Sequence, residues 1–341
     1  MTDYLHNLLT KNDLAYNTQT RYVLTFLFDV CDCRKHPELD AKETFYFVGH
    51  YENTTPFHYR MCFPLALTKW FYTRVLGRPF FTFDGCAQYL TSPTTPYLLA
   101  SAYLQAGQPP PVLLACVRDP TSQAVSWWRY ENGAIAWGEG MGLTNQNVEL
   151  RTRGYFSNSI QEALRHSLSP IVADQYARAE EIGKQVWALA KQGAFPQINA
   201  LLPLPPFALT WPGGQLTGIG RNGKFADNIA RYERVFAHSF PPLNSDRPNA
   251  VTVVNLTEQN FVPSLQGLLR LIGERVGLSR VHLEQVARAV DGRTVKRNAG
   301  SGPAPGNLEP SSKHMEELRS HFADQKQKME TLTGRQMIGW H

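Results

Sequence analysis

The stretch PVLLACVRDPTSQAVSWW (111–128) decides the fold of this chain. Residues 111–117 form a short, continuous apolar run that begins with proline, as expected of a strand buried on both faces of a sheet. Arg118, Asp119 and Pro120 then predict a turn and a helix start, because Asp can cap a helix and Pro fits its first position. A strand that leads at once into a helix is typical of a parallel α/β sheet.

A second strand is predicted at AVTVVNL (250–256), which is rich in β-branched residues and follows a polar loop. Helical patterns cover roughly 20–33, 94–106, 120–131, 160–192, 225–240, 263–276 and 312–332. Strands separated by helices predict one α/β domain over 1–341, with a central parallel sheet and helices on both faces. We place a helical and loop insertion at about 140–223, in which the Pro- and Gly-rich part 196–223 is expected to be a long surface loop.

Composition narrows the classes of function. With 18% charged and 11% aromatic residues, the chain of 341 residues is not expected to be disordered. A formal net charge of +5 is too small for a dedicated nucleic-acid-binding protein, but it suits one basic pocket for an anionic ligand. No apolar run approaches the roughly 20 residues of a membrane span. The first residues lack a secretory signal, so we expect a cytoplasmic protein, or one of the Golgi lumen if the N-terminus is truncated.

The turn after the first strand is the strongest candidate site. Arg118 is expected at the carboxyl edge of a parallel strand, where open α/β sheets bind ligands. Ser126 follows eight residues later, about two helical turns along the next helix. A guanidinium fork beside a hydroxyl suits a phosphate group. The alternative is an ordinary strand–turn–helix in which Arg118 pairs with Asp119.

Five stretches, in sequence order, resemble motifs of sulfotransferases that use 3′-phosphoadenosine 5′-phosphosulfate, in particular the heparan-type (glycosaminoglycan) branch. They are HPEL followed by KETFYF (36–47), TFDGCAQYLTSP (82–93), the strand, R-D-P and Ser segment (112–128), PSLQGLLRLIGERVGL (263–278) and the tail from 308 to 341. The matches cover about 20–132 and 225–341. The resemblance implies a P-loop-like fold of the sulfotransferase type.

The resemblance also implies two ends for the bound sulfonate donor. Its 3′-phosphate would be held by Arg118 and Ser126, with the loop that contains Arg297, Gly300 and Gly302. Its 5′-phosphosulfate would lie on the loop formed by Asn17, Thr18, Gln19, Thr20 and Arg21. In this loop Asn17 replaces the family's Lys and Gln19 replaces a Gly, while Gly85 replaces a second Lys. Lys11, Arg21 and Lys42 are candidates to supply the missing charge.

On the acceptor side, Glu43 matches the family's general base, which takes the proton from the attacking hydroxyl or amine. Lys42 beside it would lower the pKa of that carboxyl or contact an anionic acceptor. The implied reaction transfers a sulfonate group to a carbohydrate or small molecule, with no metal. The alternative is a sulfotransferase-like nucleotide- or glycan-binding protein without catalysis, which the altered 5′ loop favours.

Other features have simpler explanations. Trp127 and Trp128 are expected to pack in the core rather than stack on a base, and Cys31 and Cys33 lack the partners of a metal site. The glycines of 214–223 follow no predicted strand, so they do not indicate a dinucleotide site. Residues 1–16 contain no buried-strand pattern, and we expect 17–20 to form no compact anion nest. The 312–332 helix is expected to turn four apolar side chains inward: Leu318, Phe322, Met329 and Leu332.

Overall fold

The structure is a computed structural model, which describes residues 47, 67, 70–75, 86, 88–108, 110–140, 159–201, 218–237, 250–256 and 309–341. The chain divides into two compact units. The first comprises 1–46, 50–87 and 259–297, and its described part includes a short π-helical turn, η4 (Phe71–Val75). The second comprises 47–49, 88–258 and 298–341 and holds every other described helix and strand. The prediction of one domain with an insertion stays a prediction.

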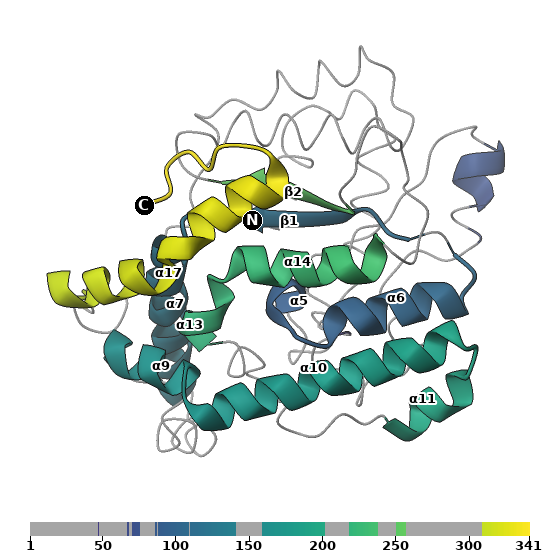
Figure 1. Cartoon of the computed structure of the whole chain (residues 1–341), viewed down its shortest axis with the longest axis horizontal. Helices are drawn as coiled ribbons and strands as arrows, with labels where there is room; N and C mark the ends of the chain where they lie inside the picture. Colours follow the sequence, from purple (N-terminus) through teal and green to yellow (C-terminus); the bar gives the residue numbers. More distant parts are fainter. Residues whose placement is uncertain are drawn as a thin grey trace, which may run out of the picture. The chain divides into compact units, whose positions relative to one another are not determined.

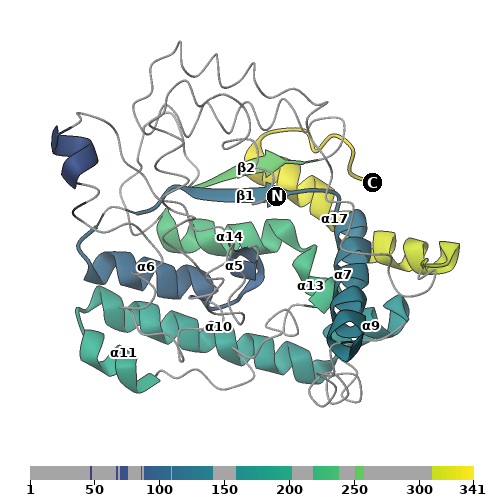
Figure 2. The ribbon, with the colours of Figure 1, turned by 180° about the vertical axis from the view of Figure 1, so that it is seen from behind.

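The second unit contains two strands and nine helices in its described residues (Figures 1 and 2). In chain order they are α5 (Gln88–Thr91), α6 (Thr95–Gln105), β1 (Leu113–Val117), α7 (Pro120–Gly140), α9 (Ile160–Ser167), α10 (Pro170–Lys191), α11 (Phe195–Leu201), α13 (Gly218–Asn222), α14 (Phe225–Phe236), β2 (Val251–Asn255) and α17 (Ser312–Thr333).

Strands β1 and β2 pair in parallel, with Leu113 opposite Val251 and Val117 opposite Asn255. Parallel neighbours need a crossover connection, and here α7 to α14 lie between the two strands in the sequence. Both predicted strands are therefore confirmed, and the described residues have the mixed helix and parallel-strand character of an α/β protein. The pairing also brings the carboxyl ends of both strands to one edge of the sheet.

Helix α14 lies between the strand pair and the two helices α6 and α10 in both views (Figures 1 and 2). Glu233 of α14 fixes the start of β2, because its two carboxylate oxygens accept hydrogen bonds from the backbone N–H groups of Ala250 and Val251, each at 2.8 Å. Further from the sheet, the buried Arg231 donates to the Tyr176 hydroxyl at 2.6 Å and thus joins α14 to α10.

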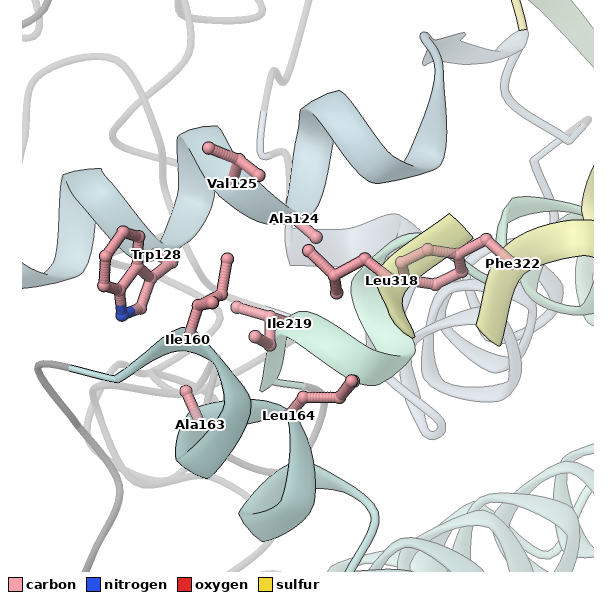
Figure 3. Packing of buried hydrophobic residues seen from close by; sticks show 9 residues of the cluster. All are labelled: Ala124, Val125, Trp128, Ile160, Ala163, Leu164, Ile219, Leu318 and Phe322. Atoms are coloured by element: carbon pink, nitrogen blue, oxygen red, sulfur yellow. The ribbon is translucent and has the colours of Figure 1, made fainter. Parts of the chain in front are cut away.

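A hydrophobic core forms where four helices meet (Figure 3). It comprises Ala124, Val125 and Trp128 of α7, Ile160, Ala163 and Leu164 of α9, Ile219 of α13, and Leu318 and Phe322 of α17. Trp127 packs against this cluster, so the pair of tryptophans serves the core as predicted. On α17 the inward face is also confirmed for Met329, which is fully buried, whereas Leu332 is half-buried.

Two predictions about the insertion are wrong. The expected helix over 160–192 is two helices, because the Ser169 hydroxyl accepts from the N–H of Val172 at 3.3 Å and Pro170 starts α10. The expected loop over 196–223 contains α11 and α13. The predicted helices over 120–131 and 225–240 are present with other ends, at Gly140 and Phe236.

Two glycines of the 214–223 stretch, Gly218 and Gly220, are packing residues of α13. A Cβ at Gly218 would lie 2.5 Å from the Cβ of Ser167, and one at Gly220 would lie 2.5 Å from the Ser167 hydroxyl. The Gly220 N–H donates to that hydroxyl at 3.0 Å. Glycine is needed here because the backbone of α13 approaches the end of α9 too closely for a side chain.

Candidate functional site

The candidate site is the turn that joins β1 to α7. Strand β1 ends at Val117, and Asp119 caps α7 as predicted: its Oδ1 accepts from the N–H of Ser122 at 2.7 Å, and its carbonyl accepts from the N–H of Gln123 at 2.9 Å. Asp119 is 4% exposed, so the cap is shielded from water. Arg118 consequently lies between the carboxyl end of a strand and the positive end of a helix of 21 residues.

Arg118 is half-buried, and its Nε donates to the Gln123 side chain at 2.5 Å. Burial lowers the pKa of the Arg118 guanidinium, and the nearby charge of Asp119 opposes this shift. Within the part of the chain that the structure describes, the terminal nitrogens Nη1 and Nη2 have no hydrogen-bond partner. These two nitrogens are the donors of the guanidinium fork that recognises carboxylates and phosphates.

The predicted partner of Arg118 is Ser126, which is exposed on α7 one helical turn after Ser122. Over the described residues no hydrogen bond joins Arg118 to Ser126, so their common action on one phosphate stays a prediction. The simpler pairing of Arg118 with Asp119 is not what the hydrogen bonds show. Arg118 bonds to Gln123, while both carboxylate oxygens of Asp119 accept backbone N–H groups.

Sequence reasoning missed the contacts of the C-terminal segment with this edge of the sheet. The second oxygen of Asp119, Oδ2, accepts from the N–H of His341 at 3.2 Å. Asn255, the last residue of β2, accepts from Trp340 Nε1 at 3.2 Å and donates to the carbonyl of Ile338 at 3.1 Å. The one signal in the sequence was Trp340 at the end of the tail motif, and a motif residue alone does not predict which residue it contacts.

The other predicted site residues lie outside the described residues: Asn17, Thr18, Gln19, Thr20, Arg21, Lys42, Glu43, Arg297, Gly300 and Gly302. The same holds for the predicted helices over 20–33 and 263–276, and for Cys31 and Cys33. The nearest described residue to Glu43 in the sequence is Phe47, four positions later. Its carbonyl accepts from the hydroxyl of Thr95, which is buried in α6, at 2.9 Å, and its ring meets that of Tyr89 at 5.8 Å. These contacts fix the end of the KETFYF stretch on α5 and α6.

Among the described side chains, no three His, Cys, Asp or Glu residues gather in the way that metal ligands do. No helix in the described ranges is both long enough and apolar enough to cross a bilayer.

Comparison with known proteins adds no relative to this picture. No protein-family model matches the chain, and no curated protein or solved structure shows significant similarity to it. The motifs of the sequence and the geometry around Arg118 are therefore the observations that bear on function.

Proposed function

We propose that this chain is a sulfotransferase, which moves a sulfonate group from 3′-phosphoadenosine 5′-phosphosulfate to a hydroxyl or amine of a carbohydrate or small-molecule acceptor. The observation that carries the proposal is the position of Arg118. Its half-buried guanidinium is held through Nε at the junction of β1 and α7, and within the described residues its terminal nitrogens are unpaired. A guanidinium fork at the carboxyl end of a parallel strand suits a phosphate, and this supports placing the 3′-phosphate of the donor here.

The proposal assigns the remaining donor contacts from the motifs. Ser126 adds a hydroxyl to Arg118 at the 3′-phosphate, together with the loop of Arg297, Gly300 and Gly302. The 5′-phosphosulfate lies at the loop 17–21, where the charge of Arg21 holds it in place of a compact nest of backbone N–H groups. The proposal makes the described strand pair part of a larger parallel sheet, and its flanking helices part of the layers on that sheet, in a sulfotransferase-type fold.

In the proposed reaction the acceptor oxygen or nitrogen attacks the sulfur atom in line with the leaving group. A new bond from the acceptor to sulfur forms as the bond between sulfur and the 5′-phosphate oxygen breaks. That bond's electron pair leaves with 3′-phosphoadenosine 5′-phosphate, and Glu43 takes the acceptor's proton. Lys42 favours the ionised, proton-accepting form of Glu43.

A second function, binding without catalysis, is favoured by one specific observation. Asn17, Gln19 and Gly85 stand where the family has Lys, Gly and Lys. A missing cation at the breaking bond removes transition-state stabilisation that is commonly worth several kcal/mol. In this alternative the chain binds the 3′-phosphate and the acceptor, but no sulfonate is transferred.

The test compares two nucleotides that differ in one phosphate. Calorimetry should show tighter binding of 3′-phosphoadenosine 5′-phosphate than of adenosine 5′-phosphate. Arg118→Ala should remove most of this preference, because a hydrogen bond to a charged group contributes about 1.5–3 kcal/mol. Arg178→Ala, which changes an exposed arginine of α10, is the matched control and should bind as wild type does. Equal affinity of the wild type for both nucleotides would contradict the proposal.

A transfer assay distinguishes catalysis from binding without catalysis. Transfer of labelled sulfonate to a panel of oligosaccharides and small alcohols should be lowered by Glu43→Gln at least about 100-fold, with donor affinity unchanged. Tight donor binding without any transfer by the wild type would favour the binding protein.

A further inference from the structure

The segment Met337–His341 lies across the ends of both described strands. After α17 the chain reverses, and in Figure 1 its last residues return to the side of the sheet where β1 leads into α7. Gly339 allows the final bend, because its φ of 78° is a left-handed conformation that favours glycine. The bend is closed by a hydrogen bond from the N–H of Trp340 to the carbonyl of Met337 at 3.3 Å.

Trp340 anchors this segment. Its side chain is 3% exposed, and its ring centroid lies 5.9 Å from that of Phe225 in α14. The indole Nε1 donates to Asn255 at the end of β2, and Lys326 of α17 donates to the Trp340 carbonyl at 2.9 Å. The segment is thereby tied to β2, α14 and α17 through one residue.

The segment also reaches the turn that carries Arg118. The N–H of His341 binds one carboxylate oxygen of Asp119, whose other oxygen caps α7 through Ser122. A single buried carboxylate therefore holds the N-terminus of α7 and the C-terminal segment at once. Loss of either bond removes a hydrogen bond from a carboxylate that is only 4% exposed, which loosens the turn.

We propose that Met337–His341 is a positioning element for the Arg118–Asp119 turn, and that docking of this segment and binding of the nucleotide 3′-phosphate strengthen each other. This inference rests on the proposed function. A turn held in its binding conformation loses less freedom when the phosphate binds, so affinity falls when the competent conformation is less populated. By linkage, the nucleotide must stabilise the docked segment by the same factor.

The first test uses Trp340→Phe, which keeps an aromatic ring against Phe225 but removes the donor to Asn255. It should weaken binding of 3′-phosphoadenosine 5′-phosphate by about fivefold or more, at the lower end of ordinary coupling between sites. Val186→Ala is the matched control, since it opens a cavity in the core of α10 away from the segment. It should lower the melting temperature and leave nucleotide affinity unchanged.

The second test needs no variant. If residues 337–341 only stabilised the fold, adding the nucleotide would not change their hydrogen exchange. Hydrogen exchange of the wild type should slow at the amides of 337–341 when the nucleotide is added, with no change in α10. If the wild type does not bind the nucleotide, the proposed function and this inference both fail. If it binds, but exchange at 337–341 is unchanged and Trp340→Phe keeps full affinity, this inference alone is overturned.

Discussion

Asp119 joins three parts of the molecule, and its replacement by alanine is predicted to cost more stability than the loss of an ordinary helix cap. The carboxylate accepts from the N–H of Ser122 at 2.7 Å and from the N–H of His341 at 3.2 Å. Asp119 itself is 4% exposed, so both bonds are made by a buried carboxylate.

The magnitude follows from these two bonds. Loss of a helix cap costs about 1 kcal/mol, and a hydrogen bond from a neutral donor to a charged group contributes about 1.5–3 kcal/mol. Asp119→Ala should therefore lower the free energy of unfolding by about 3 kcal/mol. Asp119→Asn keeps one side-chain oxygen for Ser122, but it can satisfy only one of the two donors well. We expect it to lose about half as much.

Urea unfolding followed by circular dichroism measures these differences. Ser311→Ala is the control, because the Ser311 hydroxyl caps α17 by accepting from the N–H of His314 at 3.3 Å. It should lose no more than about 1 kcal/mol. If Asp119→Ala is no more destabilising than Ser311→Ala, the bond to His341 contributes nothing, and the docking of the C-terminal segment on this turn is refuted.

Two further predictions concern α13 and its neighbours. Gly220→Ala should lower the melting temperature, because the added Cβ would lie 2.5 Å from the Ser167 hydroxyl and 3.1 Å from Leu164 Cδ1. Such overpacking costs about 1–3 kcal/mol, which exceeds the gain in helix propensity of about 1 kcal/mol. A higher melting temperature would contradict the packing of α13 against α9. Burial lowers the pKa of His321, so the stability that its neutral ring contributes is complete above a pH of about 6.5 and declines as the pH falls below it. His321→Gln should flatten the decline of stability between about pH 7 and 5. A smaller decline should remain, because burial also lowers the pKa of His166. The same slope of melting temperature against pH in the variant and the wild type would contradict this role of His321.

The strand–turn–helix around Arg118 was predictable because its determinants are local. An apolar run, a capping carboxylate and a proline stand within ten residues of one another, and each acts on its immediate neighbours. The break between α9 and α10 had a local signal as well, in Ser169 and Pro170. It was outweighed by an apolar periodicity that continues across a two-residue interruption.

Helix α13 was not predictable in this way. Its glycines favour a loop, and only the close approach of α13 to Ser167 of α9 makes their missing side chains an advantage. The contacts of Asp119 with His341 and of Asn255 with Trp340 join residues 222 and 85 positions apart. Periodicity and spacing carry no information on such pairs, because these bonds exist only once the sheet edge has formed.

Arg118 and Asp119 use their opposite charges differently, and this difference supports the proposal of an anion at the turn. Asp119 and Arg118 are neighbours of opposite charge, which would ordinarily cancel. Here the carboxylate faces inward, where two backbone N–H groups bind it, whereas the guanidinium is only half-buried and holds Gln123 through Nε. The negative charge is thus enclosed, and the positive charge remains at the helix N-terminus, which itself attracts anions. Because a half-buried charge is still screened by salt, affinity for a phosphate at this turn should fall as ionic strength rises, and Arg118→Ala should remove most of that dependence.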